Sequence, residues 1–397
     1  MARKKDTLLF DTPPVVAAWA AAGGKKESEG PLASDFDFLT QDAGFCEQGC
    51  ENWEQAESLL QRRAAELCLR KADLPRTGVD IAFAGDLQAQ CTASNYTMRE
   101  LGIPFAGVYG ACSTMAETLA LAAVFAAGGM AERALALTSS HFCAAERQFR
   151  TPLEYGAKRT PTAQWTATAA GACLVRAHGT GVPVRSVTFG RVQDYAVHDI
   201  NNMGAAMMPA AASTLLRYFA ATGARPQDFD AIFTGDLGEV GSALLREQMA
   251  REGLPLDNHR DCGCLLYDTQ GQDVQAGGSG AGCSAAVLCC KILPMLAAGQ
   301  LQFWSLLFPA SAAATPKIRL AAMPPEAAVS PPVKAPGRPH SSTACCAPCA
   351  SRCPKPSSGT LAPAPANSAS GLYRPTALRI TPATTYPVRM RAGVSFV

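Results

Sequence analysis

The stretch that decides the fold is DIAFAGDL at residues 80–87, which returns as DAIFTGDL at residues 230–237, 150 positions later. Each copy is a short apolar run that ends in Gly-Asp-Leu, as a buried strand does when it runs into a turn. A helical pattern precedes each copy, at 53–71 and 210–223, and another follows, at 95–101 and 242–252. Strands and helices that alternate in this way predict an α/β fold with mainly parallel sheets. The repeat therefore predicts an internal duplication of one α/β unit.

In each half, a long helix of small residues then begins at a glycine-flanked turn. These turns lie at Gly110-Ala111-Cys112 and at residues 278–282. Apolar patterns predict strands at 134–137, 168–176 and 182–192 after the first of these helices, and a first strand at 15–22. After its own long helix, the second half has one further apolar run, at 303–308. We therefore predict a first half at 1–193 and an incomplete second half at 194–308, whose last strands are missing or replaced.

Charge divides the chain near residue 300. Residues 1–300 carry 25 Lys and Arg against 32 Asp and Glu, a net of −7, whereas residues 301–397 carry 10 against the single acid Glu326, a net of +9. The same tail holds 16 of the 28 prolines. Such a composition buries too little apolar surface to offset the entropy of ordering, so 309–397 is predicted to be a disordered, basic, Pro- and Ala-rich tail. Three origins fit: a basic binding arm, a natural linker, and an out-of-frame translation of a GC-rich gene, which the near absence of acids favours.

Cysteine usage and hydropathy narrow the class of protein. Of 16 cysteines, 12 precede residue 300 and most lie in apolar segments, which predicts reduced, buried thiols in an intracellular protein. The four tail cysteines lack a second ligand pair at zinc-finger spacing, so no metal site is expected: Cys345, Cys346, Cys349 and Cys353. The sequence contains no run of about 18 uncharged apolar residues, so no membrane-spanning helix is predicted. Asp6 follows the first five residues directly, whereas a secretory signal continues from its basic start into an apolar run, so no such signal is predicted.

Cys112 is the candidate reactive residue because it stands where the first long helix begins. A cysteine there faces unpaired amides and the positive end of the helix dipole, which predicts a pKa lowered toward the thiolate. The position also suits a small packing residue at a tight turn, and the spacing leaves both interpretations open. A cysteine nucleophile needs a base. His141 is the candidate base, since it follows a predicted strand at the sheet end where ligands of α/β proteins bind.

The two-half layout, with a cysteine at the head of the first long helix, resembles the thiolase-like fold. Within that fold, ordered motifs between about residues 7 and 300 are similar to the stage V sporulation protein AD family. They lie at 13–14, 26–32, 53–57, 100–105, 109–114, 138–141, 148–150, 154–156, 161–165, 202–207, 234–238, 261–263 and 276–280. The resemblance implies a layered α-β-α-β-α arrangement. It stops near residue 301, where the strand, Thr-Gly-Ala turn and Gly-Glu-Ser-Ile-Pro stretch of the family are missing, in agreement with a broken reading frame.

The resemblance also implies a function. Proteins of this family bind dipicolinic acid (pyridine-2,6-dicarboxylate) or its calcium chelate and assist its transport across the inner spore membrane in sporulation and germination. The implied partners are the membrane-embedded stage V sporulation A-operon proteins, and the implied location is intracellular, peripheral at the inner membrane of the developing spore. Thiolase-like folds commonly dimerise, so a homodimer is implied. No cofactor and no nucleic-acid partner are expected.

Catalysis is not implied by the resemblance. In related ketoacyl synthases a His at the end of the second-half strand and an Asn in the late glycine turn work beside the cysteine. The corresponding positions here are Gly235 and Gly277, neither of which has a functional side chain. The resemblance therefore favours a binding protein, and the alternative is a thiolase-superfamily acyltransferase that uses Cys112.

Dipicolinate requires donors for two carboxylates and a flat slot for its ring. The candidate ligand-binding residues are the helix-start groups, hydroxyls, cations and turn glycines expected around the cysteine: Cys112, Ser113, Ser139, Ser140, His141, Arg150, Lys158, Gly277 and Gly278. For Arg150 and Lys158, a solvated surface cation is the competing interpretation.

Overall fold

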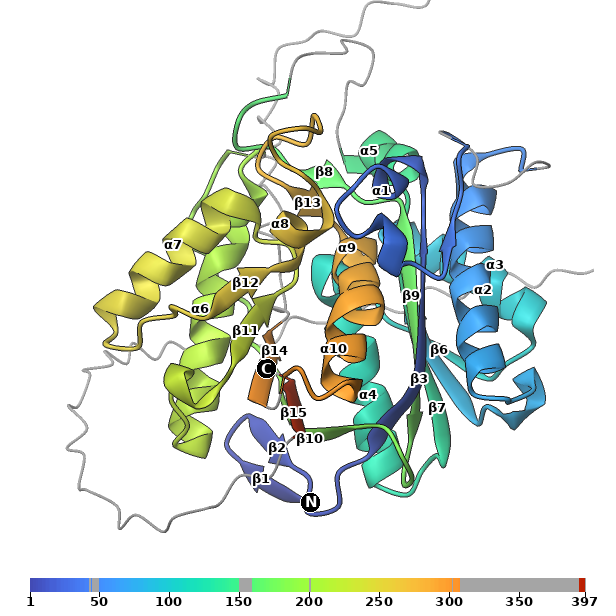
Figure 1. The fold of residues 1–397 in the computed structure, drawn as a ribbon, viewed down its shortest axis with the longest axis horizontal. Helices are drawn as coiled ribbons and strands as arrows, with labels where there is room; N and C mark the ends of the chain where they lie inside the picture. Colours follow the sequence, from blue (N-terminus) through green and yellow to red (C-terminus); the bar gives the residue numbers. More distant parts are fainter. Residues whose placement is uncertain are drawn as a thin grey trace, which may run out of the picture. The chain divides into compact units, whose positions relative to one another are not determined.

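Two sheets that meet at one strand pair organise the chain, with helices against both faces of each (Figure 1). The computed structural model describes residues 1–42, 44, 50–149, 159–199, 201–301, 303–307 and 393–396. The strands are β1 (Ala2–Lys4), β2 (Thr7–Leu9), β3 (Val15–Gly23), β4 (Phe38–Leu39), β5 (Ile81–Gly85), β6 (Phe105–Gly107), β7 (Arg133–Ser140), β8 (Trp165–Thr166), β9 (Ala169–Arg176), β10 (Val182–Thr188), β11 (Ala231–Thr234), β12 (His259–Asp261), β13 (Gly278–Ser279), β14 (Phe303–Leu307) and β15 (Gly393–Phe396).

The helices alternate with these strands along the chain. The α-helices are α1 (Lys25–Ser28), α2 (Trp53–Lys71), α3 (Thr92–Leu101), α4 (Thr114–Ala127), α5 (Phe142–Phe149), α6 (Met203–Thr222), α7 (Gly238–Arg251), α8 (Cys262–Leu266), α9 (Ala281–Val287) and α10 (Leu293–Ala297). Short 3₁₀ turns are η1 (Ala33–Asp35), η2 (Arg76–Gly78), η3 (Ala89–Cys91), η4 (Ala111–Ser113) and η6 (Pro226–Asp228), and a π-helical turn, η7 (Leu288–Ile292), joins α9 to α10.

The strand order is β12-β11-β14-β15-β10-β3-β9-β7-β5-β6. Strands β7, β5 and β6 are mutually parallel, and so are β12, β11, β14, β15 and β10. Strand β9 runs antiparallel to both β3 and β7, and the pairs Val182–Val16 and Pro183–Val15 join the two sheets through β10 and β3. Figure 1 shows the resulting five layers, in which α4, α9 and α10 lie between the sheets, α2 and α3 cover one outer face, and α6 and α7 cover the other. The layered α-β-α-β-α prediction is confirmed.

The middle strands are apolar on both faces because helices bury both. In β7, Ala134 and Ala136 face the central helices, whereas Leu135 and Leu137 face α2, as the two-residue period of a strand requires. Strand β9 alternates in the same way. This arrangement explains why the sequence of these strands reads as a continuous apolar run.

The internal duplication is present in the structure. Strands β5 and β11 hold the two copies of the repeat, α2 and α6 precede them, and α3 and α7 follow them. Helix α2 has the predicted bounds, and Asn52 caps its start by accepting a hydrogen bond from the Gln55 amide at 2.8 Å. Helices α3, α6 and α7 begin three to seven residues earlier than predicted. The proposed boundary at residue 193 falls in an irregular segment between β10 and α6 and stays a prediction.

The end of the chain supplies a strand to the second sheet. Strand β15 pairs in parallel with both β14 and β10, so it stands where the duplication argument expected strands to be missing or replaced. Most of the predicted disordered tail, 309–392, lies outside the described residues. Residues 393–396 differ from that prediction because they satisfy backbone groups of two neighbouring strands.

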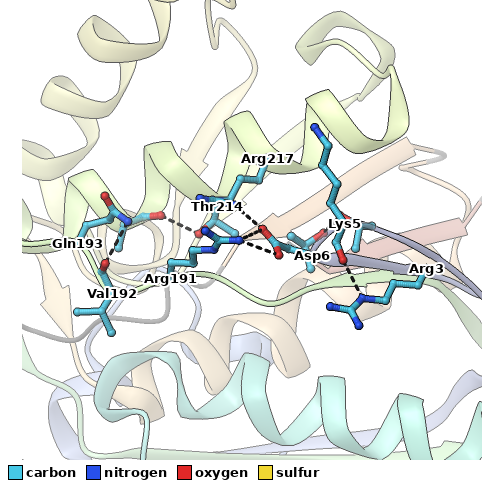
Figure 2. A network of polar contacts seen from close by, with 11 residues as sticks. Arg3, Lys5, Asp6, Arg191, Val192, Gln193, Thr214 and Arg217 are labelled. Atoms are coloured by element: carbon cyan, nitrogen blue, oxygen red, sulfur yellow. Dashed lines mark hydrogen bonds and ion pairs between the residues drawn. The ribbon is translucent and has the colours of Figure 1, made fainter. Parts of the chain in front are cut away.

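An ionic network ties the amino-terminal hairpin of β1 and β2 to α6 (Figure 2). The Asp6 carboxylate accepts hydrogen bonds from Arg191 at 3.1 and 3.2 Å and forms a second ion pair with Arg217 of α6. The hydrogen bonds from Arg191 are the largest cause of a lowered pKa of Asp6, against the opposing effect of desolvation. One carboxylate therefore joins the hairpin turn, the segment after β10 and the outer helix layer.

Helix α9 packs directly on the backbone of the first sheet. A Cβ built on Gly171 of β9 would lie 2.5 Å from the Ala285 carbonyl oxygen of α9, and one on Gly282 of α9 would lie 2.3 Å from the Ala169 carbonyl oxygen. Both approaches are closer than any side chain permits. Glycine on each element lets the helix and sheet backbones touch, and this contact sets the depth at which α9 lies.

Gly171→Ala should destabilise the fold by about 1–3 kcal/mol, because the added methyl group must displace the α9 backbone. Urea unfolding followed by circular dichroism measures this loss. Gly44→Ala is the control, since a Cβ at Gly44 meets nothing within 4 Å. Equal unfolding free energies for the two variants would contradict the role of this contact.

Candidate functional site

Cys112 lies in the strained turn between β6 and α4. Ala111, the preceding residue, has a φ of 52°, a left-handed conformation that a non-glycine residue adopts at an energetic cost. Cys112 belongs to the 3₁₀ turn η4 and is 9% exposed. The predicted turn with a cysteine at its tip is therefore present, and its side chain points into the protein.

The polar partners of the Cys112 thiol come from the second half of the chain. Its S–H donates to the carboxylate of Asp236, which follows β11 and is 1% exposed. The Ser279 hydroxyl and the Gly280 amide also contact the sulfur. Both reach Asp236 as well: the Gly280 amide donates to Asp236 Oδ2 at 2.8 Å and the Ser279 hydroxyl at 3.3 Å. The turn before α9 thus closes over a buried thiol–carboxylate pair.

The prediction of a thiolate at Cys112 is wrong. Burial, and then the negative charge of Asp236, raise the pKa of this thiol well above its usual value. The contacts from Gly280 and Ser279 oppose that rise and are smaller causes. Burial also raises the pKa of Asp236 to about 6, so at neutral pH the pair is mainly thiol and carboxylate. Desolvation outweighs the dipole of α4, and Cys112 is a hydrogen-bond donor.

Ser113 has local partners that occupy both of its donors. Its amide donates to the Gly110 carbonyl at 3.1 Å and its hydroxyl to the same carbonyl at 2.7 Å, while Glu117 Oε1 lies 3.1 Å from the hydroxyl. These bonds close the turn before α4. Ser113 therefore shapes the turn that carries Cys112.

Ser139 and Ser140 lie on opposite faces of the first sheet. Strand β7 continues to Ser140, three residues beyond its predicted end, so neighbouring side chains alternate. Ser139 faces α2, where its hydroxyl donates to Glu57 Oε1 at 2.9 Å. Ser140 faces α9, where it donates to the Ala167 carbonyl at 2.6 Å and accepts from the Gly282 amide at 3.1 Å. Ser140 thus lies by the turn that closes over Cys112, and Ser139 belongs to a different cluster.

His141 is buried and neutral. Its Nε2 lies 3.1 Å from the Gly44 carbonyl, to which it donates, and its Nδ1 has no hydrogen-bond partner among the described residues. Burial lowers the pKa of His141 to about 4. The ring is therefore held by the Gly44 carbonyl, and among the described residues it makes no hydrogen bond to the Cys112 thiol, for which it was the candidate base.

The glycine turn positions the groups that follow it. Gly277 has a φ of 110°, and its carbonyl accepts from the Trp165 amide at 2.9 Å. The Gly278 carbonyl accepts from Gln164 Nε2 at 2.8 Å. These bonds hold Ser279 and Gly280 against Asp236. Arg150 and Lys158 lie outside the described residues.

Asp236, Ser279 and Gly280 were missed by the sequence argument, which considered Gly235 and Gly277. The repeat itself held a signal, since both copies end in Gly-Asp-Leu. The two aspartates have different partners: Asp86 accepts from the Gln88 amide and from the amide and hydroxyl of Ser94, all within its own half. Asp236 instead contacts Cys112 of the other half. Matching positions in the repeat therefore predict that an aspartate follows the strand, but they do not predict its hydrogen-bond partner.

A buried carboxylate cluster lies on the other face of the first sheet, around Glu57 and Asp86. Glu57 accepts hydrogen bonds from Ser139 and, at 2.6 Å, from Gln88 Nε2. Burial, with the nearby charge of Asp86, raises the pKa of Glu57 to about 8, and burial raises the pKa of Asp86. Glu57 therefore holds a proton at neutral pH.

Known proteins are similar to this chain over most of its length. A family model described as stage V sporulation protein AD matches residues 4–318. Stage V sporulation protein AD of Bacillus subtilis is 43% identical over 298 residues, which are 75% of this chain and 87% of that protein. Within the described part of the chain, no helix has both the length and the apolar character needed to span a bilayer.

Solved structures share the fold. A 3-oxoacyl-(acyl carrier protein) synthase III from Xanthomonas oryzae superposes with a TM-score of 0.51 at 12% identity, over 76% of this chain and 96% of that one. An OleA variant from Xanthomonas campestris bound with cerulenin gives 0.50 at 15% identity, over 76% and 93%. At these identities the likeness shows the fold alone, and the thiolase-like prediction is confirmed.

Glu57→Gln should flatten the pH dependence of stability. Because the pKa of Glu57 rises from 4.5 to about 8 on folding, the folded chain binds more protons between these values and stability falls as pH rises through them. A full proton difference is worth about 1.4 kcal/mol per pH unit. Urea unfolding at several pH values should show a smaller fall for Glu57→Gln than for the parent, while Glu132→Gln, a change at a solvent-exposed side chain, should follow the parent. An equal fall in all three proteins would contradict the assignment.

Proposed function

Because the chain belongs to the stage V sporulation protein AD family, we propose that it binds dipicolinic acid or its calcium chelate and assists its transport across the inner spore membrane. The proposal assigns the protein a binding role in sporulation and germination. It places no chemical turnover at Cys112.

The thiol–carboxylate pair is the observation that supports binding over catalysis. A cysteine nucleophile reacts as the thiolate and needs a base that takes its proton. Here Asp236 accepts the S–H hydrogen bond, and burial with the charge of Asp236 raises the pKa of Cys112. A carboxylate whose pKa is about 6 is a weak base for a thiol whose pKa is far higher. The pair is therefore stable as thiol and carboxylate.

The charge of Asp236 bears on the form of the ligand. A dicarboxylate that approaches an ionised aspartate is repelled, whereas a calcium ion accepts carboxylate oxygens as ligands. The site as built thus favours the calcium chelate, or the free acid below about pH 6, where Asp236 gains a proton. Arg150 and Lys158 remain proposed donors for the ligand carboxylates.

A thiolase-superfamily acyltransferase is the second candidate. Its support is the strained residue Ala111, which presents Cys112 at the turn before α4, in a fold shared with a 3-oxoacyl-(acyl carrier protein) synthase III. Strain at such a turn is typical of nucleophile-bearing loops. The protonated state of Cys112 argues against this candidate, and turnover decides between the two.

The proposal extends to partners and location. We assign passage through the bilayer to the membrane-embedded stage V sporulation A-operon proteins, with this chain peripheral at the inner membrane of the developing spore, as a homodimer. Co-purification with those proteins from sporulating cells tests the partners, and sedimentation tests the dimer.

Calorimetric titration with dipicolinate, with and without calcium, should show saturable binding, and Cys112→Ser should retain it because serine keeps a donor to Asp236. Incubation with acyl-CoA should release no thiol beyond one equivalent. Sustained release that disappears in Cys112→Ser would establish the acyltransferase instead. Absence of heat with both ligand forms would refute the ligand.

Asp236→Asn should strengthen binding of free dipicolinate several-fold at neutral pH, because it removes a buried negative charge. Binding of the calcium chelate should not gain. Asp273→Asn, at an exposed position, controls for net charge. If Asp236→Asn changed the binding of the chelate and of free dipicolinate alike, the ligand would lie away from Asp236. Thermal melts of the variant verify that it is folded.

A further inference from the structure

A cavity of about 440 Å³ lies between α7, the edge strand β12 and α8. It is lined by Glu239, Ser242 and Arg246 of α7, His259 and Arg260 of β12, and Cys264 of α8. Its size is within the range of small-molecule sites. These residues form none of the contacts of Cys112 described above, so the cavity requires its own explanation.

Two buried polar atoms without hydrogen-bond partners belong to residues that line this cavity. Ser242 is 3% exposed and its Oγ has no partner among the described residues, and the same holds for Nδ1 of His259, which is 8% exposed. Leaving a buried polar group unpaired costs about 1–3 kcal/mol. Two such groups at one cavity indicate that a ligand supplies their partners.

The hydrogen bonds around His259 define its protonation. The Thr234 hydroxyl donates to Asp261 Oδ2 at 2.6 Å, so its oxygen accepts from His259 Nε2 at 2.8 Å. In the neutral ring the second nitrogen, Nδ1, then carries a lone pair. Asp261 does not need a further donor, since it also accepts from the amides of Leu237 and Gly238 at 2.8 and 2.9 Å.

Two arginines and two acids line the cavity. Arg246 and Arg260 are exposed, whereas Asp261 is buried and Glu239 accepts a hydrogen bond from Thr269 at 2.7 Å. Burial, followed by the charge of Arg246, lowers the pKa of His259 to about 4. Arg246 and His259 line the same cavity, and an anion bound between them would oppose this effect.

We propose that this cavity binds a small oxyanion between Arg246 and His259, with Ser242 donating a hydrogen bond and His259 taking up one proton as the anion binds. The proton comes from solvent and joins Nδ1, which then donates to the anion while Nε2–H continues to donate to Thr234. Both unpaired atoms gain partners, and the anion balances the new charge. The site is separate from the proposed dipicolinate function.

Other charged or titratable groups line the cavity beside His259. They are Glu239 of α7, Arg260 and Asp261 of β12, and Cys264 of α8. His259→Gln separates their effect from that of the imidazole, because the glutamine amide can still donate to Thr234 but cannot take up a proton. A pH dependence that belongs to His259 must disappear in this variant.

Sulfate is the first probe, since its double charge is constant across the range in which a histidine titrates. Calorimetry at about pH 5.5 and 7.5 should show sulfate binding that is several-fold tighter at the lower pH. Arg246→Gln should weaken it roughly tenfold or more, as expected for a lost bond to a charged group, and Ser242→Ala by a smaller factor. Arg99→Gln, the same charge loss on α3, should leave it unchanged. Phosphate and acetate form separate arms that distinguish a phosphoryl from a carboxylate ligand.

Three results would overturn the proposal. One is that sulfate, phosphate and acetate all fail to bind at both pH values. Another is that Arg246→Gln and Arg99→Gln behave alike. The third is a pH dependence that persists in His259→Gln. Arg246 is exposed, so its replacement leaves the fold intact, and thermal melts of each variant verify this. Dipicolinate binding unchanged in Arg246→Gln would show that the two sites are independent.

Discussion

The contact between α9 and the backbone of the first sheet is the constraint on which the rest of the structure depends. Gly171 and Gly282 let the helix and the strands approach to backbone distance. That depth places the turn before α9, with Ser279 and Gly280, against a carboxylate of the second half and a thiol of the first. The two halves of the chain thus meet where glycines without side chains let the backbones come close.

The two halves keep the same backbone plan and use it differently. Asp86 stabilises the turn into α3 within its own half, whereas Asp236 binds the Cys112 thiol across the interface of the halves. Both are buried, and each depends on a different set of donors. A duplicated strand end therefore provides a fixed place for a carboxylate, and the surrounding elements decide whether it closes a turn or joins two halves.

Local sequence predicted the elements far better than the contacts between them. Helix α2 has its predicted bounds because its cap and apolar period are local, and the turn at Cys112 was predicted because glycine and helix patterns mark it. Ser139 was misplaced because β7 runs three residues further than its apolar core, so alternation moves that side chain to α2. The pKa direction of Cys112 was missed because a helix dipole is a local property and desolvation is a tertiary one. Strand β15, four residues long, has no local signal that links it to β14.

Burial of the thiols has a consequence for the chemistry of the protein in an oxidising environment. Desolvation is the main cause of the raised pKa of Cys112, Cys173 and Cys283, so each is held as the unreactive thiol. Sulfenic acid and mixed disulfides form from exposed thiolates, which these residues do not provide. Cys173 and Cys289 lie with their sulfurs 3.6 Å apart in the core and remain free. Within the described part of the chain, the packing that folds the protein therefore also shields these buried thiols from oxidative damage.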